Sequence, residues 1–242
     1  MNAAQRKAFS QVFKQKLTLI QGPPGTGKTT ISAYLAHANV FFKNGKVLIS
    51  SHSNQAVDNI CIRIIQQFPN TKIVRVLSRG SELNEFVKEN PALSSYYLHR
   101  IAYECRKELK EMRKAHLENT ERGNQMKKHF LDLLDSTESL LLPKFDIICA
   151  TCITAGDKRF TSLEFNLVIV DEATQCIEPY TLIPFAIGAS CRARHLVLVG
   201  DQCQLGPVVQ IQDSPISISL FERLVHKNYP VCLLTVGYKP RY

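Results

Sequence analysis

The sequence lacks any hydrophobic run long enough for a membrane helix. Such a helix needs about 18 consecutive apolar residues, and Asp, Lys or Pro interrupts every candidate stretch. The first ten residues, with Arg6 and Lys7 inside an amphipathic pattern, do not resemble a signal peptide either. We therefore expect a soluble protein with no membrane partner.

Cysteine is too sparse for a disulfide scaffold, because the chain holds 8 in 242 residues. The one close pair, Cys149 and Cys152, lies in an apolar run, without a second such pair or two histidines at zinc spacing. We expect both cysteines to be core residues of a protein from a reducing compartment.

Internal repeats and low-complexity segments are also absent, and the composition is that of a globular protein. Hydrophobic residues make up 45% and charged residues 21%, which excludes a disordered tail, a collagen-like fibre and a coiled coil. Thirty Lys and Arg against 21 Asp and Glu give a net charge of +9. A surplus of this size predicts an anionic partner, with nucleic acid or a phosphorylated ligand first.

Short β-branched runs alternate with segments of helical spacing, which predicts an α/β fold with a parallel sheet covered on both faces. The expected strands are 17–20, 47–49, 73–76, 145–149, 167–170, 196–199 and 231–236, and the expected helices are 29–42, 56–68, 179–187 and 217–226.

The stretch 83–142 breaks this alternation, since it shows no strand pattern. Residues 100–128 hold nine basic and five acidic side chains, which predicts a charged helical insertion. Two interpretations stay open: a solvated helical hairpin held by ion pairs, or a surface that faces nucleic acid.

A phosphate-binding loop is the strongest motif. The residues 22–29, Gly-Pro-Pro-Gly-Thr-Gly-Lys-Thr, follow a strand and open a helix, as a P-loop requires. The backbone N–H groups would surround a triphosphate, Lys28 would contact its β and γ phosphates, and the Thr29 hydroxyl would bind Mg²⁺. The expected nucleotide-binding residues here are Gly22, Pro23, Pro24, Gly25, Thr26, Gly27, Lys28, Thr29 and Thr30.

Two further strands end in residues that would complete this site. Asp171 and Glu172 follow 167–170, so Asp171 would bind Mg²⁺ and Glu172 would orient and deprotonate the attacking water. Gln204 follows the next strand and would reach the γ-phosphate from the side opposite Lys28, because carboxyl ends of parallel strands share a crevice. We expect Lys28, Glu172 and Gln204 to be catalytic.

These blocks resemble the first RecA-like domain of superfamily 1 helicases, and most closely the up-frameshift RNA helicases that regulate nonsense transcripts. The resemblance is carried by 20–29, by Asp-Glu-Ala-Thr-Gln at 171–175, by Gly-Asp-Gln-Cys-Gln-Leu-Gly-Pro-Val-Val at 200–209 and by Ser-Leu-Phe-Glu-Arg-Leu at 219–224. It covers the whole chain and implies one RecA-like domain at 1–242, with 83–142 as its inserted subdomain.

The resemblance also implies roles that spacing cannot supply. Gln5 would read adenine and select ATP. Ser53 and Asn54, with Thr151 and Thr154, would hold a nucleic-acid backbone, although Ser53 or Asn54 as a simple helix cap stays an alternative. Tyr238 and Lys239, in the last motif, are the remaining expected nucleotide-binding residues. In place of Lys239 the family has an arginine that faces the γ-phosphate, and Lys cannot make the same bidentate contact with it.

The expected function is therefore that of an ATP- and Mg²⁺-binding, ATP-hydrolysing domain that couples to single-stranded RNA. The family uses a second RecA-like domain, which the chain does not contain, so such a domain and the decay-pathway proteins are expected partners. Three explanations for the missing domain stay open: the chain is a fragment, the product of a reduced genome, or a decayed copy. The alternatives are a non-translocating ATP- and RNA-binding adaptor, and a DNA helicase. The resemblance and the cysteine content together predict a cytoplasmic location.

Overall fold

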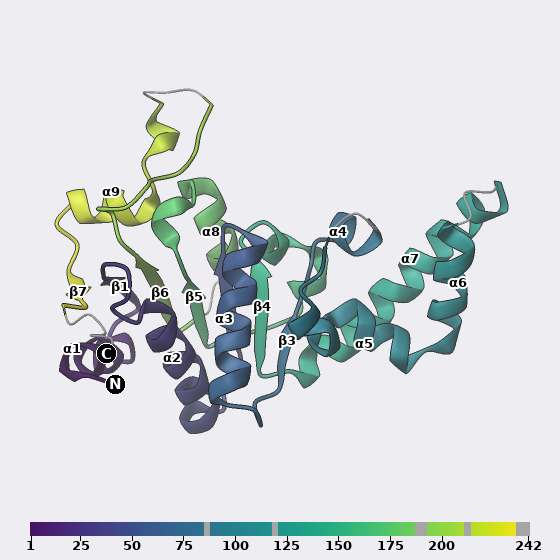
Figure 1. Ribbon diagram of the computed structural model, residues 1–242, viewed down its shortest axis with the longest axis horizontal. Helices are drawn as coiled ribbons and strands as arrows, with labels where there is room; N and C mark the ends of the chain where they lie inside the picture. The colour runs from purple at the N-terminus through teal and green to yellow at the C-terminus, as the bar shows by residue number, and fades with distance from the viewer. Residues whose placement is uncertain (85–87, 118–120, 187–192, 211–213, 236–242) are drawn as a thin grey trace, which may run out of the picture.

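A single sheet of seven parallel strands forms the centre of the protein (Figure 1). The structure is a computed structural model that describes residues 1–84, 88–117, 121–186, 193–210 and 214–235, without the side chains at 114–117, 121–126 and 215. The strand order is β3-β4-β2-β5-β6-β1-β7. The strands are β1 (Leu17–Gln21), β2 (Val47–Ser51), β3 (Ile73–Arg75), β4 (Ile147–Thr151), β5 (Leu167–Val170), β6 (His195–Gly200) and β7 (Val231–Leu233).

All seven expected strands are present, and the α/β prediction is confirmed. Strand β4 starts two residues later than expected, because Phe145 and Asp146 belong to the connection that precedes it. Strand β7 ends at Leu233, and the expected end at Val236 lies outside the described residues. The apolar runs therefore located the strands well, but not their ends.

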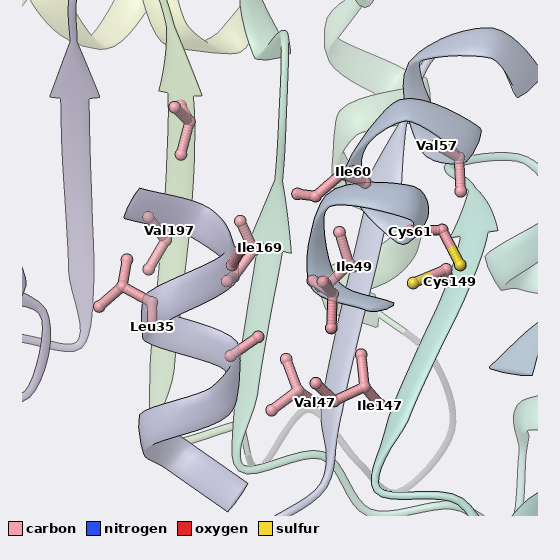
Figure 2. Close-up of a cluster of buried hydrophobic side chains, with 14 of the residues drawn as sticks. Leu35, Val47, Ile49, Val57, Ile60, Cys61, Ile147, Cys149, Ile169 and Val197 are labelled. Atoms are coloured by element: carbon pink, nitrogen blue, oxygen red, sulfur yellow. The ribbon is translucent and has the colours of Figure 1, made fainter. Parts of the chain in front are cut away.

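One face of the sheet is covered by α1 (Ala3–Val12), α2 (Lys28–Lys43) and α3 (Asn54–Gln67). In Figure 2, Leu35 of α2 and Ile60 of α3 lie over the sheet with Ile49, Ile147 and Ile169. Alternate strand residues point to this face, as the twofold period of a strand requires. Helices α2 and α3 begin one and two residues before their expected starts, at Lys28 and Asn54.

Two smaller clusters cover the opposite face. Leu48, Val74 and Ile148 pack beneath the helices α5 (Leu98–Cys105), α6 (Lys107–Leu117) and α7 (Glu121–Leu141). Leu19 and Leu198 pack with α9 (Leu220–His226), while α8 (Glu178–Ala186) lies between the two clusters. Cys149 and Cys152 are both buried, as expected, but on opposite faces, where they neighbour Cys61 and Cys176.

The segment expected as an insertion is mostly helical in its described part, with one isolated β-bridge between Tyr97 and Arg75. It contains the end of α4 (Arg79–Leu83), η1 (Pro91–Tyr96), α5, α6, α7 and the start of η2 (Leu142–Lys144). Helices α6 and α7 lie side by side and extend beyond β3 (Figure 1). Across the described residues, no helix is both long and apolar enough to cross a membrane.

A buried cluster of charged side chains fastens this segment to the sheet. Arg159 donates to Glu82 at 2.9 Å and to Glu138 at 3.0 Å, and Arg79 contacts the same two carboxylates. Because an unpaired buried charge is costly, these pairs fix α4 and α7 against the loop that holds Arg159. We call this set the insertion anchor; its members are Arg79, Glu82, Asp135, Glu138, Asp157 and Arg159.

Candidate functional site

The P-loop connects β1 to α2 with the backbone that its glycines allow. Gly25 and Gly27 have φ values of +78° and +87°, a region that side chains other than glycine rarely adopt. Gly27 also caps α2, and no side chain binds the first N–H groups of this 16-residue helix. These groups are therefore directed at the loop, where an anion would accept from them.

Lys28 lies inside the loop. Its side chain is buried, and Nζ donates to the carbonyl of Gly22 at 2.9 Å. Burial raises the pKa of Asp171 and the Lys28 charge opposes this rise, while the same charge contributes to the lowered pKa of Asp201. The Lys28 amine thus supplies a positive charge at the carboxyl ends of the neighbouring strands β1, β6 and β5.

Asp171 follows β5 and is almost fully buried. Burial, followed by the charge of Glu172, raises its pKa to about 7, although the Glu172 N–H, Lys28 and the Thr29 hydroxyl oppose this rise. A buried carboxylate whose negative charge is only partly balanced by its neighbours fits a divalent cation. Carboxylate and hydroxyl oxygens are the hard ligands that Mg²⁺ takes, so Asp171 and Thr29 fit this ion.

Glu172 follows Asp171 in the turn after β5. Its backbone is left-handed, with φ 51°, and its N–H donates to Asp171 at 3.2 Å. The pKa of His52, directly after β2, is lowered by burial, and the charge of Glu172 partly opposes this. Its role as a base stays a prediction.

Asp201 is a site residue for which the sequence analysis found no role. It is buried at the end of β6, and it accepts from Gln204 at 2.9 Å and from the backbone N–H of Cys203 at 3.2 Å. Burial alone would raise its pKa, but Gln204, Cys203, Lys28 and Gln21 together lower it. The Gln204 amide, expected at the γ-phosphate, is thus held by Asp201 in this structure. The Gly-Asp pair at 200–201, directly after an apolar strand, is the sequence feature from which Asp201 could have been predicted.

Gln5 lies beside the P-loop although it belongs to α1. Its Nε2 donates to the carbonyl of Thr26 at 3.0 Å, and its Oε1 accepts from the N–H of Asn2 at 3.0 Å. Gln5, which we expect to read adenine, therefore lies next to the phosphate loop, and this role stays a prediction. Pro23 and Pro24 are exposed, and Thr30 is half-buried in α2.

The four expected nucleic-acid contacts lie at the carboxyl ends of β2 and β4, which are neighbours. Ser53 caps α3 by accepting from the N–H of Ala56 at 3.2 Å, and Asn54 accepts from Arg75 at 2.8 Å. Thr151 and Thr154 share a hydrogen bond of 2.8 Å. The helix-cap alternative for Ser53 is thus observed, and backbone binding stays a prediction for all four. Tyr238 and Lys239 lie outside the described residues.

Comparison with known proteins gives the family. A family model described as "AAA domain" matches residues 1–130 and 81–212. The chain belongs to this family.

Its relatives are regulators of nonsense transcripts. This AAA domain chain is 37% identical over 242 residues to "Regulator of nonsense transcripts 1 homolog" of Drosophila melanogaster, and 36% identical to "ATP-dependent helicase NAM7" of Saccharomyces cerevisiae. Both alignments cover 99% of this chain, but only 20% and 24% of the relatives. The resemblance to up-frameshift helicases is confirmed, and the chain spans about a fifth to a quarter of their length.

A solved structure also aligns with the AAA domain chain, the Sulfolobus solfataricus SWI2/SNF2 ATPase core in complex with dsDNA. The TM-score is 0.48 with 14% identity, over 91% of this chain and 35% of that chain.

Proposed function

We propose that this chain is one RecA-like domain of an RNA helicase, with 83–142 inserted in it, and that it binds and hydrolyses ATP. The observation that carries the proposal is that Lys28 and Thr29 at the end of the P-loop lie beside Asp171. A glycine-rich turn alone could be structural, but a buried carboxylate beside a buried lysine and an open helix N-terminus favours a triphosphate and its metal. Identity of 36% over 99% of the chain to two proteins named as ATP-dependent helicases supports the same proposal.

Each residue has a task in this proposal. The P-loop N–H groups bind the phosphates, and Lys28 leaves the Gly22 carbonyl to contact the β and γ oxygens. Thr29 and Asp171 hold Mg²⁺, which would neutralise developing phosphate charge. Glu172 orients and deprotonates water, and Gln204 exchanges Asp201 for the γ-phosphate and so senses its loss.

The proposed partner is single-stranded RNA across the carboxyl ends of β2 and β4, where Ser53, Asn54, Thr151 and Thr154 lie. A second RecA-like domain would close the cleft over the nucleotide and complete it with arginines. Similarity to regulators of nonsense transcripts supports decay-pathway proteins as partners and the cytoplasm as the location.

A titration with a fluorescent ATP analogue tests the nucleotide site. Wild type should bind Mg-ATP in preference to Mg-GTP, and Lys28→Ala and Asp171→Ala should bind at least tenfold more weakly. Glu172→Gln is the matched control, because it should keep ATP affinity. Equal affinity of wild type and Lys28→Ala would contradict the proposal.

A further inference from the structure

The positive charge of the chain is concentrated at one end of its sequence. Residues 1–81 hold 11 Lys and Arg and a single acidic residue, Asp58, which leaves 19 basic and 20 acidic residues in the other 161. Asp58 is already paired, at 2.7 Å, with Arg75. The net charge of the whole protein therefore resides in the part that builds α1, α2, α3 and the first three strands.

The fold gathers much of this charge at the amino edge of the sheet, opposite the nucleotide site. In Figure 2 this is the end at which Val47 and Ile147 lie. The residues that directly precede the first six strands in sheet order, from β3 to β1, are Lys72, Asp146, Lys46, Asn166, Arg194 and Lys16. Neighbouring strands lie about 4.8 Å apart, so this row is about 24 Å long.

Cations outnumber carboxylates along this edge. Lys43 at the end of α2 and Lys144 in η2 are exposed beside the row, and the acidic side chains there are Asp146 and Glu164. A hollow of about 630 Å³ at the edge is lined by Lys46, Arg194, Asn44, Asn166 and Glu164, among others. Among the described residues that line this hollow, the two cations Lys46 and Arg194 face the single carboxylate of Glu164, so the hollow is positive.

Exposed aromatic rings adjoin the row. Phe41 and Phe42 at the end of α2 are 71% and 75% exposed, and their centroids are 5.0 Å apart. His37, one turn earlier, stacks on Phe68 at 3.9 Å and contacts the Thr71 hydroxyl at 3.3 Å, beside Lys72. The two exposed rings contact each other and so form a contiguous apolar patch, a feature that is typical of binding surfaces.

We propose that this amino edge is a second binding surface for single-stranded nucleic acid, formed by Lys16, Lys43, Lys72, Arg194, Phe41 and Phe42. Lys46 lies in the same row, but its Nζ already donates to the carbonyls of Pro143 and Phe145 at 2.6 and 2.7 Å. Phosphates bind the lysine and arginine row, and unpaired bases stack on the phenylalanines. Cations combined with exposed rings are the composition of single-strand binding grooves. An acidic peptide would use the cations but would leave the phenylalanines without flat partners.

This surface is independent of the nucleotide site. It lies at the opposite ends of the strands from Lys28, Asp171 and the four candidate contacts at β2 and β4. A strand bound there would remain attached whether or not ATP is bound. The surface would thus hold nucleic acid near the domain throughout nucleotide turnover.

Fluorescence anisotropy with a labelled oligouridylate tests the proposal in the full 242-residue chain. The double variant Phe41→Ala, Phe42→Ala should weaken binding about tenfold or more, since stacking on one ring is worth a comparable factor. The double variant Lys43→Gln, Lys72→Gln should lower the slope of log K against log salt by about 0.7 for each phosphate that these two lysines neutralise in wild type. Tyr180→Ala on α8 and the double variant Lys7→Gln, Lys227→Gln, whose lysines are exposed and lie outside both the amino edge and the insertion, are matched controls and should bind as wild type.

The possible outcomes separate this inference from the proposed function. If Thr151→Val weakens binding while the amino-edge variants bind as wild type, the second surface does not exist and the helicase proposal stands. If polyglutamate competes as well as oligouridylate and the phenylalanine variant is unaffected, the edge binds acidic chains and the inference is wrong. Urea midpoints and ATP affinity should match wild type in the phenylalanine variant, because both rings are exposed. Absence of any oligouridylate binding would overturn both RNA assignments and leave the ATP site untouched.

Discussion

Gly27 occupies a position in the P-loop where any side chain would strain the backbone and contact Gln5. Alanine at φ +87° is strained by about 1–2 kcal/mol, and its Cβ would lie 2.6 Å from Nε2 of Gln5. We predict that Gly27→Ala lowers the unfolding free energy by roughly 1–3 kcal/mol and weakens ATP binding. Urea denaturation and nucleotide titration measure the two effects.

Gly80 provides the matched control. An added Cβ there would meet nothing within 4 Å, and the residue lies in the helix α4 without a positive φ. Gly80→Ala should leave stability unchanged or raise it by up to about 1 kcal/mol through helix propensity. A similar loss in both variants would mean that the P-loop conformation is not the cause.

Ser53 has a structural role that is observed and a binding role that is proposed. Its hydroxyl caps α3, so Ser53→Ala should cost about 1 kcal/mol of unfolding free energy. Ser219 caps α9 in the same way, accepting from Glu222 at 3.1 Å, and Ser219→Ala should cost a similar amount. Anisotropy with RNA then distinguishes the roles, because only Ser53→Ala should weaken binding. Equal RNA affinity in both variants would leave Ser53 as a cap alone.

At the scale of elements, the insertion anchor makes stability depend on pH. Burial, and then the charge of Glu138, raises the pKa of Glu82 from 4.5 to about 7, although Arg159 and Arg79 oppose this. The folded state therefore holds a proton that the unfolded state releases between these values, and this contribution to stability is lost as pH rises through 7. We predict that the unfolding free energy of wild type minus that of Glu82→Gln, measured by urea denaturation, decreases between about pH 5 and pH 8.

Asp135 of the same anchor should show the opposite sign. Burial alone would raise its pKa, but the hydrogen bond from Lys158 and the charge of Arg79 lower it. The advantage of wild type over Asp135→Asn should therefore shrink as pH falls below the ordinary range of an aspartate. If the two differences changed with pH in the same direction, the assignment of the proton to Glu82 would be wrong.

Elements were predictable from sequence where one local pattern decides them. The β-branched run 167–170 is a strand with those same bounds, and the glycines of the P-loop identified the turn that follows β1. The insertion anchor was not predictable, because Glu82, Glu138 and Arg159 are far apart in sequence and meet only through packing. The same holds for Asp201 with Gln21, and for Asn54 with Arg75, whose contacts cross between elements.

At the scale of the whole molecule, the proposal predicts slow turnover. In the proposed function, arginines from a second domain complete the site, and an arginine supplied in this way is worth about 10³ to 10⁵ in rate. The 242-residue chain alone should therefore hydrolyse ATP very slowly, with little stimulation by RNA, in a phosphate-release assay. Rapid RNA-stimulated hydrolysis that Glu172→Gln abolishes would show that the domain is sufficient by itself.

The position of β1 in the sheet has a consequence for synthesis on the ribosome. β1 pairs with β6 and β7, and Leu17 aligns with Leu196, about 180 residues later. At 5–20 residues per second, the nascent chain needs roughly 10–40 s between these two points. During that interval β2, β4 and β5 can already pair with one another, while Leu17–Gln21 remains an unpaired apolar segment. The P-loop is thus translated early, but the strand that precedes it obtains both of its sheet neighbours only after β6 and β7 have been synthesised.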